Sequence, residues 1–80
     1  MIYITASVPL HEDSMAAWEL ANARLEKASE GFDCAGAGTG FGERDMDWSF
    51  EPSEKARAEE LYRRLVAEFS AERVSIDYEA

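Results

Sequence analysis

Eighty residues with 46% hydrophobic side chains and nine aromatic ones make a single domain, residues 1–80, and exclude a disordered chain. The formal net charge is −9, from seventeen acidic and eight basic side chains, so attraction to nucleic acid or to anionic lipid is unfavourable over most of the surface. This balance favours basic protein partners instead.

The start of the chain and its only cysteine bear on the compartment. The first ten residues, MIYITASVPL, have neither the basic start nor the long apolar middle of an export signal, and no apolar run approaches the roughly 20 residues that cross a bilayer. Cys34 cannot form an internal disulfide and is expected to be a small buried apolar side chain, with an intermolecular bridge or a reactive thiol as the alternatives. These features predict a cytoplasmic protein.

The first third of the chain predicts a strand and a helix. Residues 2–8, IYITASV, alternate apolar and polar side chains with the period of a half-buried strand, which Pro9 ends. Asp13 or Ser14 can cap the helix that follows, expected over residues 13–30, and Gly31 can stop it. Its apolar stripe recurs at three- and four-residue spacing and consists of Ala17, Trp18, Ala21, Leu25 and Ala28.

The stretch GAGTGFG, residues 36–42, is either a phosphate-binding loop or part of a strand. The spacing of a dinucleotide fingerprint fails from Gly36 and from Gly38, and Glu43 stands where a P-loop needs lysine. Strands are therefore expected over residues 33–41 and 44–51, with a turn somewhere within 38–44. One face of the first arm is bare glycine, which would allow a helix or another backbone to approach closely.

The remaining segments complete the expected fold. The core side of the second arm carries Met46, Trp48 and Phe50. A second amphipathic helix is expected over residues 52–69, starting near Pro52, and a last strand over 73–79 with Val74, Ile76 and Tyr78 facing inward. The order strand, helix, strand, strand, helix, strand predicts a ferredoxin-like α+β sandwich, βαββαβ. Both helices would cover one face of a four-stranded antiparallel sheet whose first and third strands are central.

The uncovered face of this sheet is expected to be acidic, with five acids and no base. Helix 52–69 has as many bases as acids, so the excess negative charge lies elsewhere. The carboxylates expected on the face, spaced along each strand by multiples of roughly 6.6 Å, are those of Asp45, Asp47, Glu51, Asp77 and Glu79. Such a ladder imitates a row of phosphates. Two explanations stay open: solubility with edge protection, or recognition of a basic groove.

Catalytic and metal sites are not expected. His11 is the only histidine and lies in a predicted loop, where a solvated side chain is the simplest interpretation. His11, Glu12 and Asp13 form too small a cluster to specify a metal. Asp45 and Asp47 would lack the burial that raises the pKa of a catalytic carboxylic acid. We therefore predict a protein that is not an enzyme and has no cofactor.

Two enzyme families share the predicted strand and helix order. The start MIYITASVPL with the following helix resembles the antibiotic-biosynthesis-type monooxygenases, which implies a dimeric ferredoxin-like enzyme, although the glycine hairpin departs from that family. An acylphosphatase-like enzyme would need an arginine where this chain has Pro9, Leu10 and His11.

In size and acidity, the chain is closer to phage anti-CRISPR proteins of the DNA-mimic kind and to immunity proteins that neutralise basic nucleases. That resemblance implies a stoichiometric inhibitor, monomer or homodimer, that occupies a Lys/Arg-lined groove on a CRISPR effector complex or a nuclease without contacting nucleic acid directly.

Overall fold

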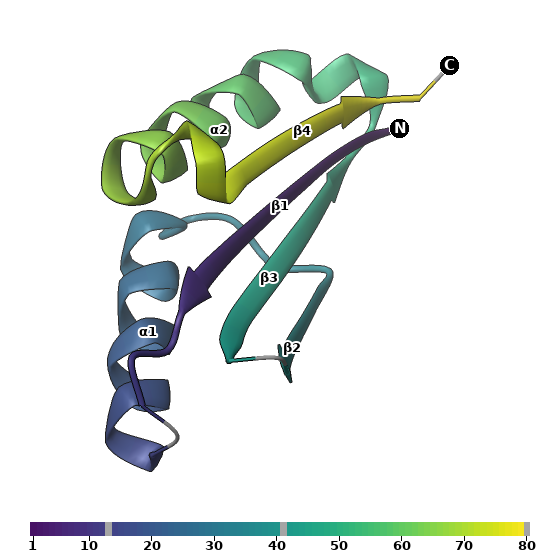
Figure 1. Ribbon diagram of the computed structural model, residues 1–80. Coiled ribbons are helices and arrows are strands. Elements are labelled where there is room, and N and C mark those ends of the chain that lie inside the picture. Colours follow the sequence, from purple (N-terminus) through teal and green to yellow (C-terminus); the bar gives the residue numbers. More distant parts are fainter. Residues whose placement is uncertain (13, 41, 80) are drawn as a thin grey trace.

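The computed structural model describes residues 1–12, 14–40 and 42–79. Six main elements follow one another along the chain (Figure 1): β1 (Ile2–Pro9), α1 (Met15–Ala28), β2 (Gly36–Gly40), β3 (Glu43–Phe50), α2 (Lys55–Phe69) and β4 (Val74–Tyr78). Short 3-10 turns, Pro52–Glu54 and Ala71–Arg73, precede α2 and β4. The element order is the predicted βαββαβ.

The four strands form one antiparallel sheet in the order β2-β3-β1-β4. Ile4 at the centre of β1 stands opposite Trp48 of β3 and Ile76 of β4. Helix α2 packs on β1 and β4, whereas α1 packs on β1 and β3, so both helices cover one face (Figure 1). The predicted ferredoxin-like α+β arrangement is thus confirmed, including the central position of the first and third strands. We call the uncovered side of the sheet the open face.

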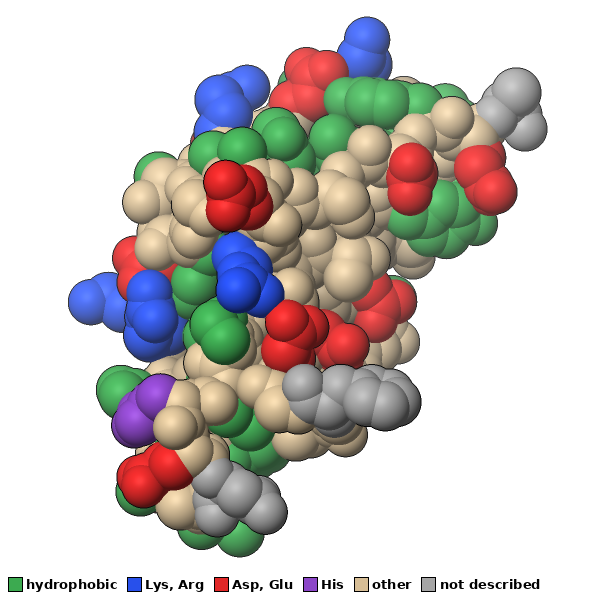
Figure 2. All heavy atoms as spheres, in the orientation of Figure 1, with side chains coloured by type: hydrophobic (Ala, Val, Ile, Leu, Met, Phe, Trp, Pro, Cys, Tyr) green, Lys and Arg blue, Asp and Glu red, His purple; other side chains and the backbone are tan. Residues whose placement is uncertain are grey.

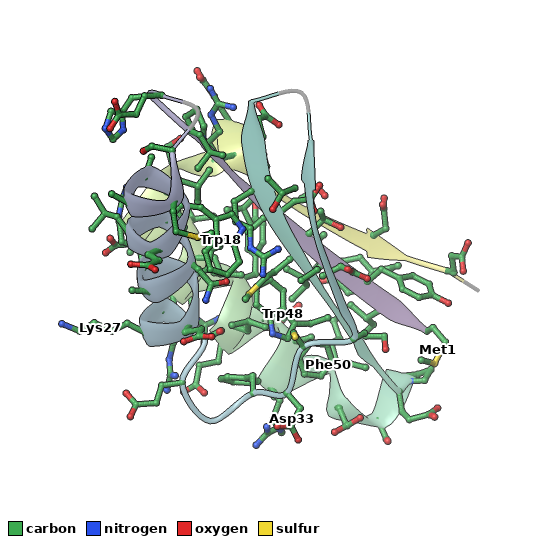
Figure 3. All side chains as sticks on the ribbon, turned by 90° about the horizontal axis from the view of Figure 1, so that it is seen from below. Met1, Trp18, Lys27, Asp33, Trp48 and Phe50 are labelled. Carbon is green, nitrogen blue, oxygen red and sulfur yellow. The ribbon has the colours of Figure 1, made fainter. Side chains whose placement is uncertain are left out.

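The core lies between the sheet and the helices and follows from the alternation of β1 and β3. Trp48 is only 1% exposed, as predicted for a side chain on the core side of β3 in the middle of the strand. Figure 3 shows Trp48 and Phe50 on the helix side of the sheet. The buried core cluster consists of Ile2, Ile4, Ala6, Val8, Ala21, Leu25, Met46, Trp48, Phe50, Ala58, Leu61, Leu65 and Val74.

Helix α1 begins and ends through local hydrogen bonds. The Ser14 hydroxyl oxygen accepts from the backbone N–H of Ala17 at 3.1 Å, which identifies Ser14 as the N-cap. The alternative cap, Asp13, lies outside the described residues. At the other end the Ser29 N–H donates to the Leu25 carbonyl at 3.0 Å, two residues before Gly31 takes a positive φ of 91°. The helix is shorter than predicted because Ser29 caps it before the glycine is reached.

The β2–β3 hairpin has its turn between Gly40 and Glu43. Gly42 adopts a φ of 75°, a conformation that glycine accepts at little cost, and its carbonyl accepts a 2.7 Å hydrogen bond from the N–H of Leu10. The turn thus falls within the predicted range 38–44, and Phe41 lies outside the described residues. β2 starts at Gly36, three residues later than predicted.

Cys34 and Tyr78 were predicted to face inward, and both are exposed. Cys34 belongs to the connection between α1 and β2, where Phe32 takes the inward position and meets the ring of Phe50 edge-on at 6.0 Å. Tyr78, the last residue of β4, is 53% exposed, and its hydroxyl donates to Glu59 of α2 at 3.1 Å. Tyr78 therefore lies on the predicted helix side, opposite Ile2 of β1, but at the strand end the core no longer covers its side chain.

Candidate partner-binding surface

The five predicted acids all have exposed side chains at the open face or its end. Asp45 and Asp47 of β3 stand opposite Ser7 and Thr5 of β1, on the side away from the buried Met46 and Trp48. Asp77 of β4 stands opposite Tyr3 of β1. Glu51 and Glu79 each follow the last residue of their strand.

The acids form two rows rather than one continuous ladder. The β3 row consists of Asp45, Asp47 and Glu51, and the β4 row consists of Asp77 and Glu79. Strand β1 lies between the two rows, which are therefore two strand spacings, or about 10 Å, apart. Between them β1 carries only uncharged Tyr3, Thr5 and Ser7. Figure 2 shows acidic side chains at the side of the molecule where the strands lie, with uncharged surface between them. A partner would therefore meet two negative rows flanking a hydroxyl-bearing strip.

The carboxylates of Asp45, Asp47, Asp77 and Glu79 have no hydrogen bond or ion pair to any described residue. Six of the eight side-chain cations make contacts with other described residues, and none of these contacts is with Asp45, Asp47, Asp77 or Glu79. These contacts join Arg24 to Glu68, Arg44 to Asn22, Arg57 to the Gly31 carbonyl, Arg64 to the Glu30 carbonyl, Arg73 to Glu43, and Lys55 to the Tyr78 ring. The open face thus keeps charge that the fold itself does not neutralise.

One ion pair at this surface was missed in the sequence. Arg73 Nη1 donates to Glu43 Oε1 at 2.8 Å, and both side chains remain about 40% exposed, at 39% and 42%. Glu43 alternates in step with Asp45 and Asp47, so the pair reaches across the open face at the end opposite Glu51. The prediction of no base on this face is wrong. Extending the β3 alternation by one residue would have placed Glu43 on this side, but its pairing with Arg73 depends on how the strands align.

The glycines of β2 lie on the open face, and their neighbours are carboxylates rather than a helix or a backbone. An ideal Cβ built on Gly36 would lie 2.8 Å from Asp47 Oδ1, and one built on Gly38 would lie 3.2 Å from Asp45 Oδ1. A Cβ on Gly40 would meet nothing within 4 Å. The expectation of close backbone packing is therefore wrong. The missing side chains instead let Asp45 and Asp47 lean over β2.

The other candidate catalytic or metal-binding residues do not come together in one site. His11 Nε2 lies 3.9 Å from Glu12 Oε1 with both side chains largely exposed. Within the described ranges no three His, Cys, Asp or Glu side chains gather closely enough to hold a metal ion. A groove of about 870 Å³ between α1 and α2 is lined by Arg24 and Arg64, whose guanidinium groups already bond to Glu68 and to the Glu30 carbonyl.

Comparison of the chain with protein-family models, with curated proteins and with solved structures finds no match. In the part of the chain that the structure describes, no helix is both long enough and apolar enough to cross a membrane. The function must therefore be argued from the surface itself.

Proposed function

We propose that this chain is a small acidic inhibitor that docks its open face on a basic, nucleic-acid-binding groove of a target protein. The observation that carries the proposal is the set of exposed carboxylates on that face, Asp45, Asp47, Asp77 and Glu79, that pair with no described residue. Lysine and arginine side chains of a partner would supply the missing counter-charges. The protein would act by occupancy and would need neither catalysis nor a cofactor.

Electrostatics favours recognition over a purely solubilising role. Repulsion among the carboxylates of one face opposes folding, and among the described residues only Glu43 on this face is paired with a base. A complementary basic groove would be steered to this face over long distances and would lose affinity as salt rises. Solubility alone would be served equally well by charges distributed over both layers of the molecule.

The proposed target is a protein that binds nucleic acid through a Lys/Arg-lined groove, such as a CRISPR effector complex or a nuclease. The chain would then be a DNA mimic of the anti-CRISPR kind encoded by a phage, with an immunity protein as the variant aimed at a nuclease. The proposed compartment is the cytoplasm, where the exposed thiol of Cys34 would stay reduced. The alternative, a dimeric enzyme that buries its open face, is disfavoured because the acidic rows of one protomer would then face the acidic rows of the other and repel them.

A charge-reversal variant tests the proposal. Replacing Asp45, Asp47 and Asp77 together with lysine should abolish capture of the partner from host lysate, because each exposed pair contributes only about 0.2 to 1 kcal/mol and several must be lost together. The parent should lose its partner steeply across a salt gradient.

The matched control carries the same charge change on the helix layer, with lysine at Glu19, Glu26 and Glu30, and should bind as the parent does. Binding that survives the sheet variant and fails in the helix variant would assign recognition to α1 and overturn the proposal.

A further inference from the structure

We propose that the free edge of β2 pairs with an extended basic segment of the partner, which joins the sheet as a fifth strand. This inference rests on the proposed function and names how that partner docks. β2 ends the strand order β2-β3-β1-β4, and its backbone bonds only to β3 among the described elements. Every second N–H and C=O of an edge strand points outward and is open to pairing.

This edge lacks the charged side chains and the proline with which proteins often block added strands. Residues 36–40, GAGTG, contain no charge and no proline. The opposite edge strand, β4, carries Asp77 and is flanked by Glu72 and Glu79. Ala37 and Thr39, on the helix side of β2, are themselves small and exposed. Of the two edges, β2 is the one that is open to a partner backbone.

The neighbouring carboxylates define the chemistry of the incoming strand. Asp45 and Asp47 lean over Gly38 and Gly36, with their oxygens 3.2 and 2.8 Å from where a Cβ would stand. The oxygens are therefore displaced toward the free edge, across a strand that has no side chain on this face at these two positions. A fifth strand would lie two strand spacings, about 10 Å, from β3, a distance that a long basic side chain can cover.

The negative charge of Asp45 and Asp47 indicates which kind of strand can pair with β2. Two copies paired through β2 would bring two molecules of net charge −9 together, with Asp45 and Asp47 of each copy three strand spacings, about 14 Å, from those of the other. A segment with lysine or arginine at alternate positions would instead set its cations over the bare glycines, where they meet Asp47 and Asp45. We therefore assign the edge to a basic strand of the partner and not to a second copy.

Two peptides of equal charge test the pairing. The probe is a peptide of alternating lysine and threonine, and its control has the same sequence with N-methyl groups on every second residue, which removes one edge of backbone donors. The probe should shift the amide resonances of residues 36–40 and slow their hydrogen exchange, and the control should bind about tenfold more weakly. Equal binding of both peptides, or no change at residues 36–40 at millimolar probe, would overturn the inference.

Glycine substitutions supply a matched pair within the chain. Gly36→Ala must displace the Asp47 carboxylate, so probe affinity should fall about threefold, whereas Gly40→Ala meets open space and should leave it unchanged. Equal affinities of the two variants would contradict the role of the leaning carboxylate. If these tests fail while the triple lysine variant still loses its partner, the open face binds without strand addition. If the triple variant also binds normally, both proposals fall.

Discussion

Trp48 combines a buried ring with an unpaired donor. Its side chain is 1% exposed, and its indole Nε1 has no hydrogen-bond partner among the described residues. Leaving a buried donor unpaired costs about 1 to 3 kcal/mol, whereas removing the whole ring leaves a cavity that costs about 3 to 5 kcal/mol. The ring therefore stabilises the fold by filling the core, and its unpaired N–H lowers the free energy of unfolding by a smaller amount.

Two substitutions at this residue separate the effects. Trp48→Ala should lower the free energy of unfolding by about 3 to 5 kcal/mol, a large part of the total for a small domain. Trp48→Phe should stay within about 1 kcal/mol of the parent, because the smaller ring loses contacts but also removes the unpaired N–H. Urea denaturation of the three proteins measures the differences. A phenylalanine variant as unstable as the alanine variant would mean that the indole nitrogen is stabilising.

Tyr78 provides a titration probe of the contact between β4 and α2. Partial desolvation of its phenol, the hydrogen bond from its hydroxyl to Glu59 and the charge of that carboxylate raise the pKa of Tyr78 above its ordinary value. Since the raised pKa favours the neutral phenol in the folded state, this contribution to stability is complete below about pH 10 and is lost as pH rises through the raised pKa.

Glu59→Gln should lower the pKa of Tyr78 toward its ordinary value, because the variant removes the carboxylate charge. The chemical shifts of the Tyr78 ring, followed by NMR against pH, measure the change. Glu60→Gln is the control, since Glu60 is on the same helix but forms its ion pair with Arg64, at 3.6 Å. An unchanged Tyr78 titration in the Glu59 variant would show that the hydrogen bond does not persist in solution.

Among the elements, those with strong periodicity were predicted well. The alternation of β1 and β3 and the apolar stripe of α2 follow from which side chains must be buried, and Ala58, Leu61 and Leu65 of α2 are fully buried. β2 was placed less well because a segment of glycine, alanine and threonine has no apolar alternation to fix its ends. The residues predicted for its start, including Cys34, form a connection instead.

Helix α1 is attached by contacts that its sequence pattern does not reveal. Its buried residues are two alanines and Leu25, which bury little area. Trp18 instead donates its indole N–H to the Thr39 hydroxyl at 2.9 Å, and the Arg44 guanidinium lies 4.9 Å from the centre of the Trp18 ring. Both partners belong to the β2–β3 hairpin, so the helix is held by tertiary polar contacts that periodicity cannot predict.

The candidate surface was predictable where it depends on alternation alone. Asp45, Asp47 and Asp77 face away from the core because their neighbours along the strand face into it. The ion pair of Arg73 with Glu43 depends on the register between three strands, and the lean of Asp47 depends on the bare glycine beside it. Such features require the pairing of strands, which one sequence does not specify.

At the scale of the whole molecule, charge is divided between the two layers. Helix α2 and the turn before it, residues 52–69, have four acids and four bases, while the sheet carries the unpaired acids of β3 and β4. Replacing three aspartates by lysine changes the charge by two at each site and would bring the net charge from −9 to −3. Stability should therefore respond to these residues even though they contact no described partner.

The triple variant of Asp45, Asp47 and Asp77 should be more stable than the parent at low ionic strength, by about 1 to 2 kcal/mol, because repulsion between the rows is relieved. At 0.01 M salt the screening length is about 30 Å, longer than the spacing of about 10 Å between the rows, and at 1 M it is about 3 Å. The difference should therefore nearly vanish at 1 M sodium chloride. Thermal unfolding of both proteins across this range measures it. A variant that is less stable than the parent at 0.01 M would show that these carboxylates make stabilising contacts within the fold, and their availability to a partner would then have to be abandoned.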